Sequence, residues 1–402
     1  MKGLSRCIEL VLVLFVMISC SNKSSVDSSF LPQVNLRKSL SEIDVLPLKD
    51  EIKSVSYIPL KETANDTSLI DGIASYAITS EYIYILPVKE ARIVVFDRKG
   101  NFIKAIINKG QGPYEFNGEI TNIQADEKNN RLYLYNAENI WEYTLEGEFI
   151  NKHTHEYLSV LTYKLQDDNF AAVALPYIPF ETGSFGLGIF TKEGNKIITK
   201  NDFTSEYVSK DKAGFTIRIA ASPVSTPPSI LFKAGCNDTI FRITENCIVP
   251  AGVVKLDNSE EEIINSLDVT NFSSMSLPPK ETDIIVTDLM ETSRRIYIRF
   301  QYRNHFHVAS LDKVTKNVCV EECCQPVNFA KLSDANLLMG MIGTLSFNNF
   351  PIWGHVIGKE LVQVVTPYEL SLFSESEHVK IPSELQYIDE YDNPIFIIYK
   401  LK

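Results

Sequence analysis

The chain has 402 residues and a net charge of −12, and 45% of its residues are hydrophobic while 22% are charged. This composition is that of a globular protein, and it excludes disordered and fibrous classes. The acidic balance and the absence of any clustered Lys/Arg stretch argue against a nucleic-acid partner, because nucleic acids bind basic surfaces.

The first residues predict a targeting segment. Lys2 and Arg6 precede an apolar run from Leu10 to Ile18, which is too short to span a bilayer as a mature helix. The sequence that ends at Cys20 resembles a bacterial lipobox, in which the Cys is acylated and becomes the new N-terminus. We predict residues 1–19 as a lipoprotein signal peptide and Cys20 as the lipidation site, with a simple signal peptide and a chance Cys as the alternative.

Polar residues rich in Ser follow Cys20, so residues 20–50 are predicted to be a flexible tether. The mature protein would then be an outer-membrane lipoprotein of the cell envelope, attached to the membrane through its N-terminal lipid. Some surface lipoproteins carry an acidic run just after the Cys, whereas here only Asp27 is acidic. Both a periplasmic and a surface orientation stay open.

A repeat dominates the rest of the chain. Gly100, Gly147 and Gly194 are spaced 47 residues apart, and each lies in a turn between two apolar, strand-like runs. Another strand pair precedes each of these hairpins, for example around the turn at 128–130. Each unit therefore contains about four strands in 47 residues, which is close to the blade length of β-propellers. Asp97 and other aspartates beside the turns are predicted to bond to backbone amides.

The number of repeats predicts a six-bladed β-propeller with four-stranded antiparallel blades, and seven blades are possible. The propeller domain is predicted to cover residues 51–402, with an insertion at about 258–282 that is acidic and then rich in Ser and Pro. The ring must close, and Ile52 to Leu60 has strand character. We predict that this N-terminal strand pairs with the C-terminal strand in Asp392 to Lys402, which would protect the sheet edges.

Two sets of segments resemble known families. The order of Arg92 to Lys104, Asn108 to Phe116 and Arg131 to Asn136 resembles the NHL repeat, with a hairpin, a G-x-G-x-x-x-F loop and a following strand. Asn237 to Ile243 and Asp392 to Leu401 are similar to segments of the six-bladed β-propeller lipoproteins of Bacteroidetes. The resemblance implies the same fold and an envelope location, and it implies no particular activity.

Five residues are candidates for ligand binding. Tyr114 and Trp353 lie in segments that read as loops, where exposed aromatic side chains would suit stacking on sugars or gripping peptides. His305 and His307 would face the same side of a strand, and Arg303 lies beside them. The alternative is that the aromatic side chains pack between blades and that the histidines are ordinary core or rim residues.

No motif points to a cofactor or a metal. The cysteines at 319, 323 and 324 lack the paired spacing of zinc sites, and no G-x-S-x-G motif of α/β-hydrolases occurs. We therefore expect neither cofactor nor metal and name no catalytic residue. The sequence favours a ligand-binding or protein-interaction module whose partner is a glycan, a peptide or an envelope protein. The alternative is a carbohydrate-active lyase or hydrolase with its site in the central funnel.

Overall fold

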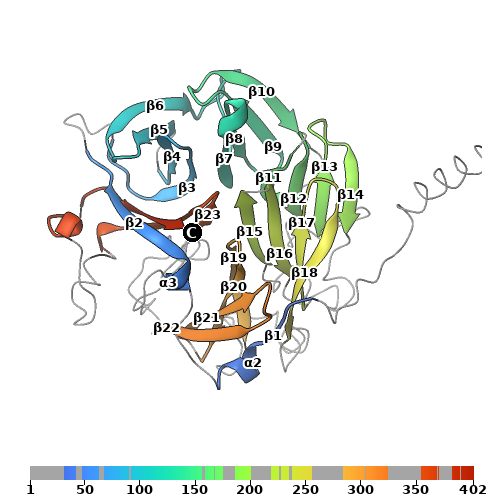
Figure 1. Ribbon diagram of the computed structural model, residues 1–402. Coiled ribbons are helices and arrows are strands. Elements are labelled where there is room, and N and C mark those ends of the chain that lie inside the picture. The colour runs from blue at the N-terminus through green and yellow to red at the C-terminus, as the bar shows by residue number, and fades with distance from the viewer. Residues whose placement is uncertain are drawn as a thin grey trace, which may run out of the picture. The chain divides into compact units, whose positions relative to one another are not determined.

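The computed structural model describes sixteen stretches of the chain (Figure 1), namely residues 31–41, 48–62, 68–89, 92–155, 159–166, 168–174, 186–200, 219–225, 228–234, 238–255, 284–303, 305–324, 355–368, 370, 383–389 and 391–402. The chain separates into two units, Met1–Leu31 and Pro32–Lys402, and the second unit holds the fold described below. Among these residues, no helix is both long and apolar enough to cross a membrane.

The second unit is all-β and forms a six-bladed β-propeller, in which six sheets surround a common axis (Figure 1). This confirms the predicted fold and the count of six blades. From the axis outward, blade 1 consists of β3 (Ile73–Ile78), β4 (Tyr82–Pro87), β5 (Arg92–Asp97) and β6 (Phe102–Asn108). Blade 2 consists of β7 (Asn122–Asp126), β8 (Arg131–Tyr135), β9 (Asn139–Tyr143) and β10 (Phe149–Thr154). Blade 3 consists of β11 (Ser159–Lys164), β12 (Phe170–Ala174), β13 (Leu187–Phe190) and β14 (Lys196–Lys200).

Blades 4 to 6 follow the same order. Blade 4 consists of β15 (Ile219–Ser225), β16 (Pro228–Ala234), β17 (Thr239–Ile243) and β18 (Ile248–Lys255). Blade 5 consists of β19 (Ile285–Glu291), β20 (Arg295–Tyr302), β21 (His305–Asp312) and β22 (Val318–Cys324). Blade 6 consists of β23 (His355–Ile357), β24 (Glu360–Val365), β25 (Ile395–Leu401) and β2 (Ile52–Pro59). Helical turns are few, namely α2 (Leu36–Ser39), α3 (Leu48–Glu51), η2 (Glu127–Asn129) and η5 (Ser383–Leu385) in the described part of the chain.

The ring closes through the N-terminal strand, as predicted. β2 is the outer strand of blade 6 and pairs antiparallel with β25, so one blade combines both ends of the propeller domain. The register runs from Ile52 opposite Leu401 to Pro59 opposite Ile395. Because the last blade needs a strand from each end of the domain, the ring is complete only when both ends have folded.

The three equally spaced glycines lie in equivalent turns between the third and fourth strands of blades 1 to 3. Gly100, Gly147 and Gly194 have φ angles of 80°, 97° and 81°, a region that favours glycine over other residues. Gly100 also lies against the end of the closing strand, because its carbonyl accepts from the Lys61 N–H at 2.8 Å. A Cβ at Gly100 would overlap the Pro59 carbonyl oxygen.

We expect the Gly100→Ala variant to lose at least about 2 kcal/mol of unfolding free energy, since it adds positive-φ strain and overpacking at the closing strand. Gly358→Ala is the matched control, because Gly358 also has a positive φ (61°) but no atom lies within 4 Å of the added Cβ. Its expected loss is about 1 kcal/mol. Chemical denaturation of both variants measures the difference, and equal losses would show that contact with the closing strand has no energetic weight.

The segment before β2 also contacts the propeller. β1 (Gln33–Asn35) adds to blade 4 as a fifth strand, parallel to β18, and Val34 and Leu36 are fully buried. This stretch lies inside the range 20–50 for which the sequence predicted a flexible tether, and the residues of β1 pair with blade 4. The predicted insertion at 258–282 lies outside the described residues.

Apolar side chains fill five of the six interfaces between blades. Each of these five clusters contains ten or more buried hydrophobic residues. Ion pairs reinforce some interfaces near the tips of the hairpins. Arg98 of blade 1 bonds to Glu360 of blade 6 at 2.7 Å, and Arg242 of blade 4 bonds to Glu291 of blade 5 at 2.6 Å. The interface between blades 2 and 3 differs and is described below.

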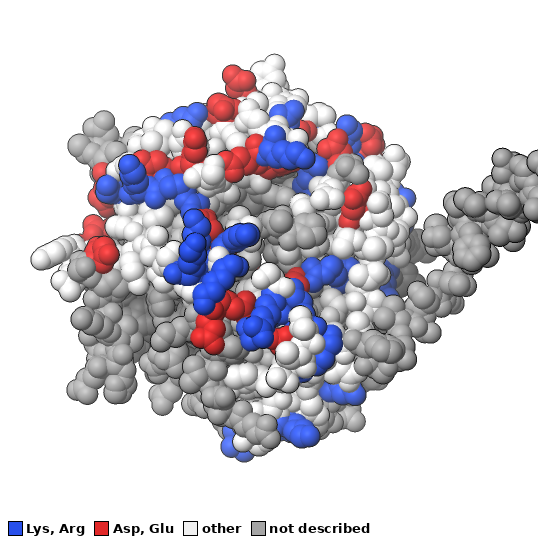
Figure 2. All heavy atoms as spheres, in the orientation of Figure 1, with Lys and Arg blue, Asp and Glu red and all other residues white. Residues whose placement is uncertain are grey.

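The tips of the hairpins within the blades form one face of the propeller, which we call the hairpin-turn face. It carries the turns that join first to second and third to fourth strands, while the loops between blades run on the opposite side. Figure 2 shows Lys and Arg side chains gathered around the middle of the face that it presents, with Asp and Glu side chains interspersed. Mixed charge of this kind contrasts with the single-sign basic surfaces of nucleic-acid-binding proteins.

Candidate functional site

Polar side chains from three blades meet where the innermost strands surround the axis. Tyr76 lies on β3 of blade 1, Asp288 on β19 of blade 5, and His355 on β23 of blade 6, while Arg299 reaches the group from β20. We call these four residues the axial cluster. Inner strands of a propeller converge on its axis, so side chains that are distant in sequence become neighbours there.

His355 is the centre of this cluster. Its ring lies edge-on to the Tyr76 ring, with the centroids 5.9 Å apart, and Tyr76 also packs edge-on against Phe396 at 5.2 Å. The His355 residue is exposed to solvent, and it lies on β23, the innermost strand of blade 6. Solvent therefore reaches this residue on the side of the blade that faces the axis.

Asp288 and Arg299 form an ion pair beside His355. Arg299 Nη2 lies 2.5 Å from Asp288 Oδ2, and Arg299 Nε lies 3.3 Å from Thr287 Oγ1. The register between β19 and β20 shifts between Val286 and Asp288, which marks a β-bulge. Bulges of this kind re-aim side chains next to functional sites. Here the bulge places Asp288 opposite Arg299, with about a third of its side chain exposed.

Burial lowers the pKa of His355 below its ordinary value, and the Arg299 guanidinium lowers it further, while the Asp288 carboxylate opposes both effects. The ring is therefore mainly neutral near pH 7, with one nitrogen as donor and the other as acceptor. Burial alone raises the pKa of Tyr76, whose hydroxyl lies 3.4 Å from the Val362 carbonyl oxygen. The cluster thus offers neutral and ionic partners to a polar ligand.

The three sequence-predicted candidates whose side chains the structure describes, Tyr114, Arg303 and His307, are not part of the axial cluster. Tyr114 lies in the connection between β6 and β7, is 67% exposed, and its ring is 5.4 Å from that of Phe149. Arg303 lies in the turn between β20 and β21 with its guanidinium 5.2 Å from the centroid of the Tyr302 ring. His307 is buried and stacks on Phe300 at 5.3 Å. The backbone of His305 belongs to β21, but its side chain and the whole of Trp353 lie outside the described residues.

No sequence motif indicated the axial cluster. Tyr76 and His355 share only one recognisable property, which is their position in the first strand of a blade. Within the described stretches, no three His, Cys, Asp or Glu side chains are grouped so as to hold a metal ion. Cys247 is an exposed thiol.

Solved structures share this fold at low sequence identity. An exported protein from Bacteroides fragilis aligns over 90% of this chain and 98% of its own, with 16% identity and a TM-score of 0.65. A member of the DUF4221 family from Bacteroides vulgatus aligns over 87% of this chain and 97% of its own, with 12% identity and a TM-score of 0.51. At these identities the likeness concerns the fold.

The sequence itself matches a family model over nearly the whole chain. No protein with curated annotation matches it. The model that matches is described as a domain of unknown function, DUF4934, and it covers residues 31–400. That range includes β1 and all six blades. The chain belongs to the DUF4934 family, which here has the fold of a six-bladed β-propeller.

Proposed function

We propose that this protein is a lipid-anchored ligand-binding module of the cell envelope, and that it binds a polar group of its ligand at the axial cluster. The observation that carries the proposal is His355, which solvent reaches at the axis while groups from blades 1 and 5 surround it. Ligands bind where a few polar groups converge on a concave, mostly preformed site.

The chemistry of the cluster favours a hydroxyl-bearing ligand such as a glycan. The neutral His355 ring can donate one hydrogen bond and accept another, and the Asp288 carboxylate accepts. Tyr76 adds an aromatic ring beside the histidine. Sugar hydroxyls both donate and accept, so they match this mixture better than a purely anionic or apolar ligand does. A peptide or an envelope protein is the other outcome that the binding experiment distinguishes.

The envelope location is supported by two observations. The N-terminal sequence predicts a signal peptide that ends at Cys20, where a lipid would be attached. The similar protein from Bacteroides fragilis is described as exported. A radiolabelled fatty acid incorporated into the wild-type chain but not into the Cys20→Ser variant would support the anchor, and equal labelling of both would overturn it.

Binding to glycan and peptide arrays tests the site, with the chain that begins just after Cys20 as the probe. We expect His355→Ala to weaken binding of the selected ligand by about ten-fold, the cost of one or two hydrogen bonds. Tyr114→Ala is the matched control, because Tyr114 is exposed and lies on the outer connection. If Tyr114→Ala abolishes binding and His355→Ala does not, the ligand binds at the loop residues and the axial site is wrong.

A second candidate function is a carbohydrate-active lyase or hydrolase. It is favoured by the lowered pKa of His355, because a neutral imidazole next to a phenol can act in general acid–base catalysis. Incubation of the protein with the glycans that bind it distinguishes the two. Product formation that His355→Ala abolishes would make the protein an enzyme, and unchanged glycans would leave binding as its function.

A further inference from the structure

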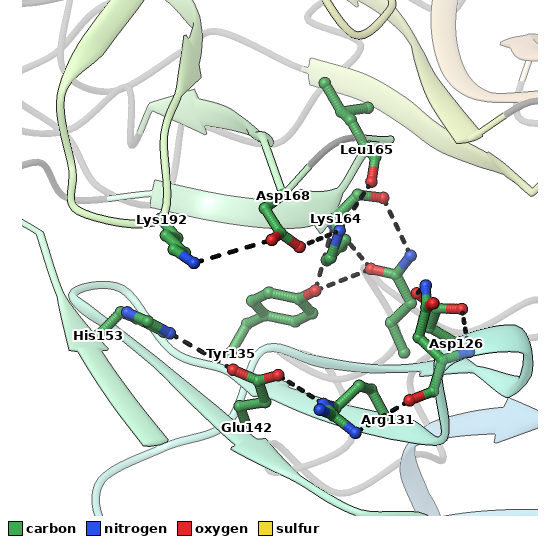
Figure 3. Close-up of polar contacts among 11 residues, drawn as sticks. Asp126, Arg131, Tyr135, Glu142, His153, Lys164, Leu165, Asp168 and Lys192 are labelled. Carbon is green, nitrogen blue, oxygen red and sulfur yellow. Dashed lines mark hydrogen bonds and ion pairs between the residues drawn. The ribbon is translucent and has the colours of Figure 1, made fainter. Parts of the chain in front are cut away.

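The interface between blades 2 and 3 is polar, unlike the other five. Among the residues that the structure describes there, the buried hydrophobic cluster has four members, namely Tyr133, Tyr135, Ile140 and Phe170. Charged and polar side chains occupy the remaining space, and Figure 3 shows them directed toward one another from both blades. A seam of this kind gives up hydrophobic stabilisation, so its polar groups call for an explanation beyond packing.

Lys164 lies at the centre of this seam with only 7% of its side chain exposed. Its ammonium donates to the Leu165 carbonyl oxygen and lies 3.2 Å from Asp168 Oδ1 (Figure 3). It also lies about 6 Å from the ring centroids of Tyr133 and Phe170. An ammonium carries three N–H groups. Two of those of Lys164 have oxygen acceptors among the described residues, and the third has none.

Two further donors lie at the same edge of the seam. The Lys192 side chain is 48% exposed, and its Nζ lies 3.8 Å from Asp168 Oδ2, which is longer than a hydrogen bond. Tyr133 is 97% buried, and its hydroxyl has no hydrogen-bond partner in the described part of the chain. Burial and the charges of Glu142, Asp126 and Asp168 raise the pKa of Tyr133 far above its ordinary value, so the hydroxyl remains a donor.

We propose that the ammonium groups of Lys164 and Lys192 and the hydroxyl of Tyr133 form a second binding site, for an anionic oxygen group such as a carboxylate or a phosphate. Three donors without a full set of acceptors match a ligand that only accepts. Asp168 is the chain's own anion between the two lysines, and its carboxylate is 63% exposed and can swing away. This site is separate from the axial cluster, because none of its residues belongs to blades 1, 5 or 6.

Because Asp168 occupies the proposed site with its own negative charge, removing that charge should strengthen anion binding. Lys164 holds the pKa of Asp168 below its ordinary value, and Lys192 and Arg131 add to the effect, so Asp168 is ionised and competes with an incoming anion. Asp168→Asn removes the charge, and Asn tolerates the left-handed backbone at this position (φ 62°) as Asp does. This variant should therefore bind anions several-fold more tightly, although it folds less stably.

Isothermal titration calorimetry of the full mature chain with inorganic phosphate, with glucuronate and with neutral glucose tests the proposal. We expect at least one of the two anions to bind and glucose not to bind. Tyr133→Phe and Lys192→Gln should each weaken binding by about ten-fold. Tyr133→Phe should leave the denaturation midpoint nearly unchanged, because the hydroxyl has no hydrogen-bond partner to lose among the described residues. Phosphate binding alone identifies a phosphate-bearing ligand, and glucuronate binding alone identifies an acidic sugar.

Two controls make the result decisive. Tyr163→Phe changes a comparably buried tyrosine in the neighbouring interface of blades 3 and 4 and should bind anions like the wild type. His355→Ala should also bind anions like the wild type, which separates this site from the axial one. The proposal is overturned if neither anion binds, or if anion binding is the same in the wild type, Tyr133→Phe, Lys192→Gln and Asp168→Asn.

Discussion

The Ser56→Pro variant is expected to lose at least about 3 kcal/mol of unfolding free energy, because proline removes a ladder hydrogen bond in the strand that closes the ring. Leu60 and Pro394 form a hydrogen-bonded pair, because the Leu60 N–H donates to the Pro394 carbonyl oxygen at 3.3 Å. Along two antiparallel strands, directly opposite residues alternate between hydrogen-bonded and non-bonded pairs. Ser56, opposite Ile398, therefore belongs to a bonded pair. Urea denaturation followed by circular dichroism measures the loss.

Val55→Pro is the matched control for this prediction. Val55 is the neighbouring residue, lies opposite Tyr399 and belongs to a non-bonded pair, so its N–H points outward from the edge strand. Pro59, which lies four residues further along the same strand, already occupies another non-bonded position. We expect Val55→Pro to cost clearly less than Ser56→Pro. A Ser56→Pro chain as stable as the wild type would show that closure by β2 does not support the fold.

Asp312→Ala is expected to lose about 2–3 kcal/mol, the cost of removing a charged acceptor from a shielded network. The carboxylate accepts from the backbone N–H groups of Val314 and Thr315 at 2.9 Å and from Arg294 Nε at 2.7 Å. It is 2% exposed, because its own turn and the arginines cover it. Arg295 Nη2 lies 3.3 Å from it, and this arginine also bonds to Glu51, the residue just before the closing strand.

The loss should depend on pH. The backbone N–H of Thr315, together with Arg294 and the N–H of Val314, holds the pKa of Asp312 well below its usual range. Since the unfolded chain has the higher pKa, about 3.9, the ionised carboxylate contributes its full stability above that value and loses it as the pH falls. Asp312→Ala should flatten the decline of the denaturation midpoint below pH 4.

Asp97→Ala is the control, because Asp97 accepts from Lys99 N–H and Asn101 N–H in the equivalent turn of blade 1, as predicted, and has no arginine partner in the described residues. Its expected loss is about 1 kcal/mol. Equal losses in Asp97→Ala and Asp312→Ala would show that the arginines add nothing.

The sequence predicted the fold well where the repeat is regular. The turn glycines at equal spacing place blades 1 to 3, and an apolar strand at each end of the domain predicts closure, because a propeller needs a partner for its last edge. The pairing of β1 with blade 4 could not be predicted from the sequence. Its three residues are held by burial of Val34 between blades 4 and 5 rather than by any local pattern.

The axial cluster could not be predicted, because the residues that form it come from three blades that are far apart in the sequence. Tyr76 and His355 meet only when the ring has closed, and nothing local distinguishes either of them. The polar interface between blades 2 and 3 has a weak signal in the sequence of β8. In β8, Arg131, Tyr133 and Tyr135 alternate with Leu132 and Leu134, so one face of the strand is apolar and the other is polar and aromatic.

The most direct test of the axial binding site is nuclear magnetic resonance of the chain with labelled histidine rings. The chain has six histidines, and His355→Gln assigns the resonance of His355 by its absence. We predict that the His355 ring titrates below pH 6.5 and that its resonance shifts when the ligand selected on the arrays is added. A ligand that shifts the resonance of another histidine, or of none, would contradict binding at the axis.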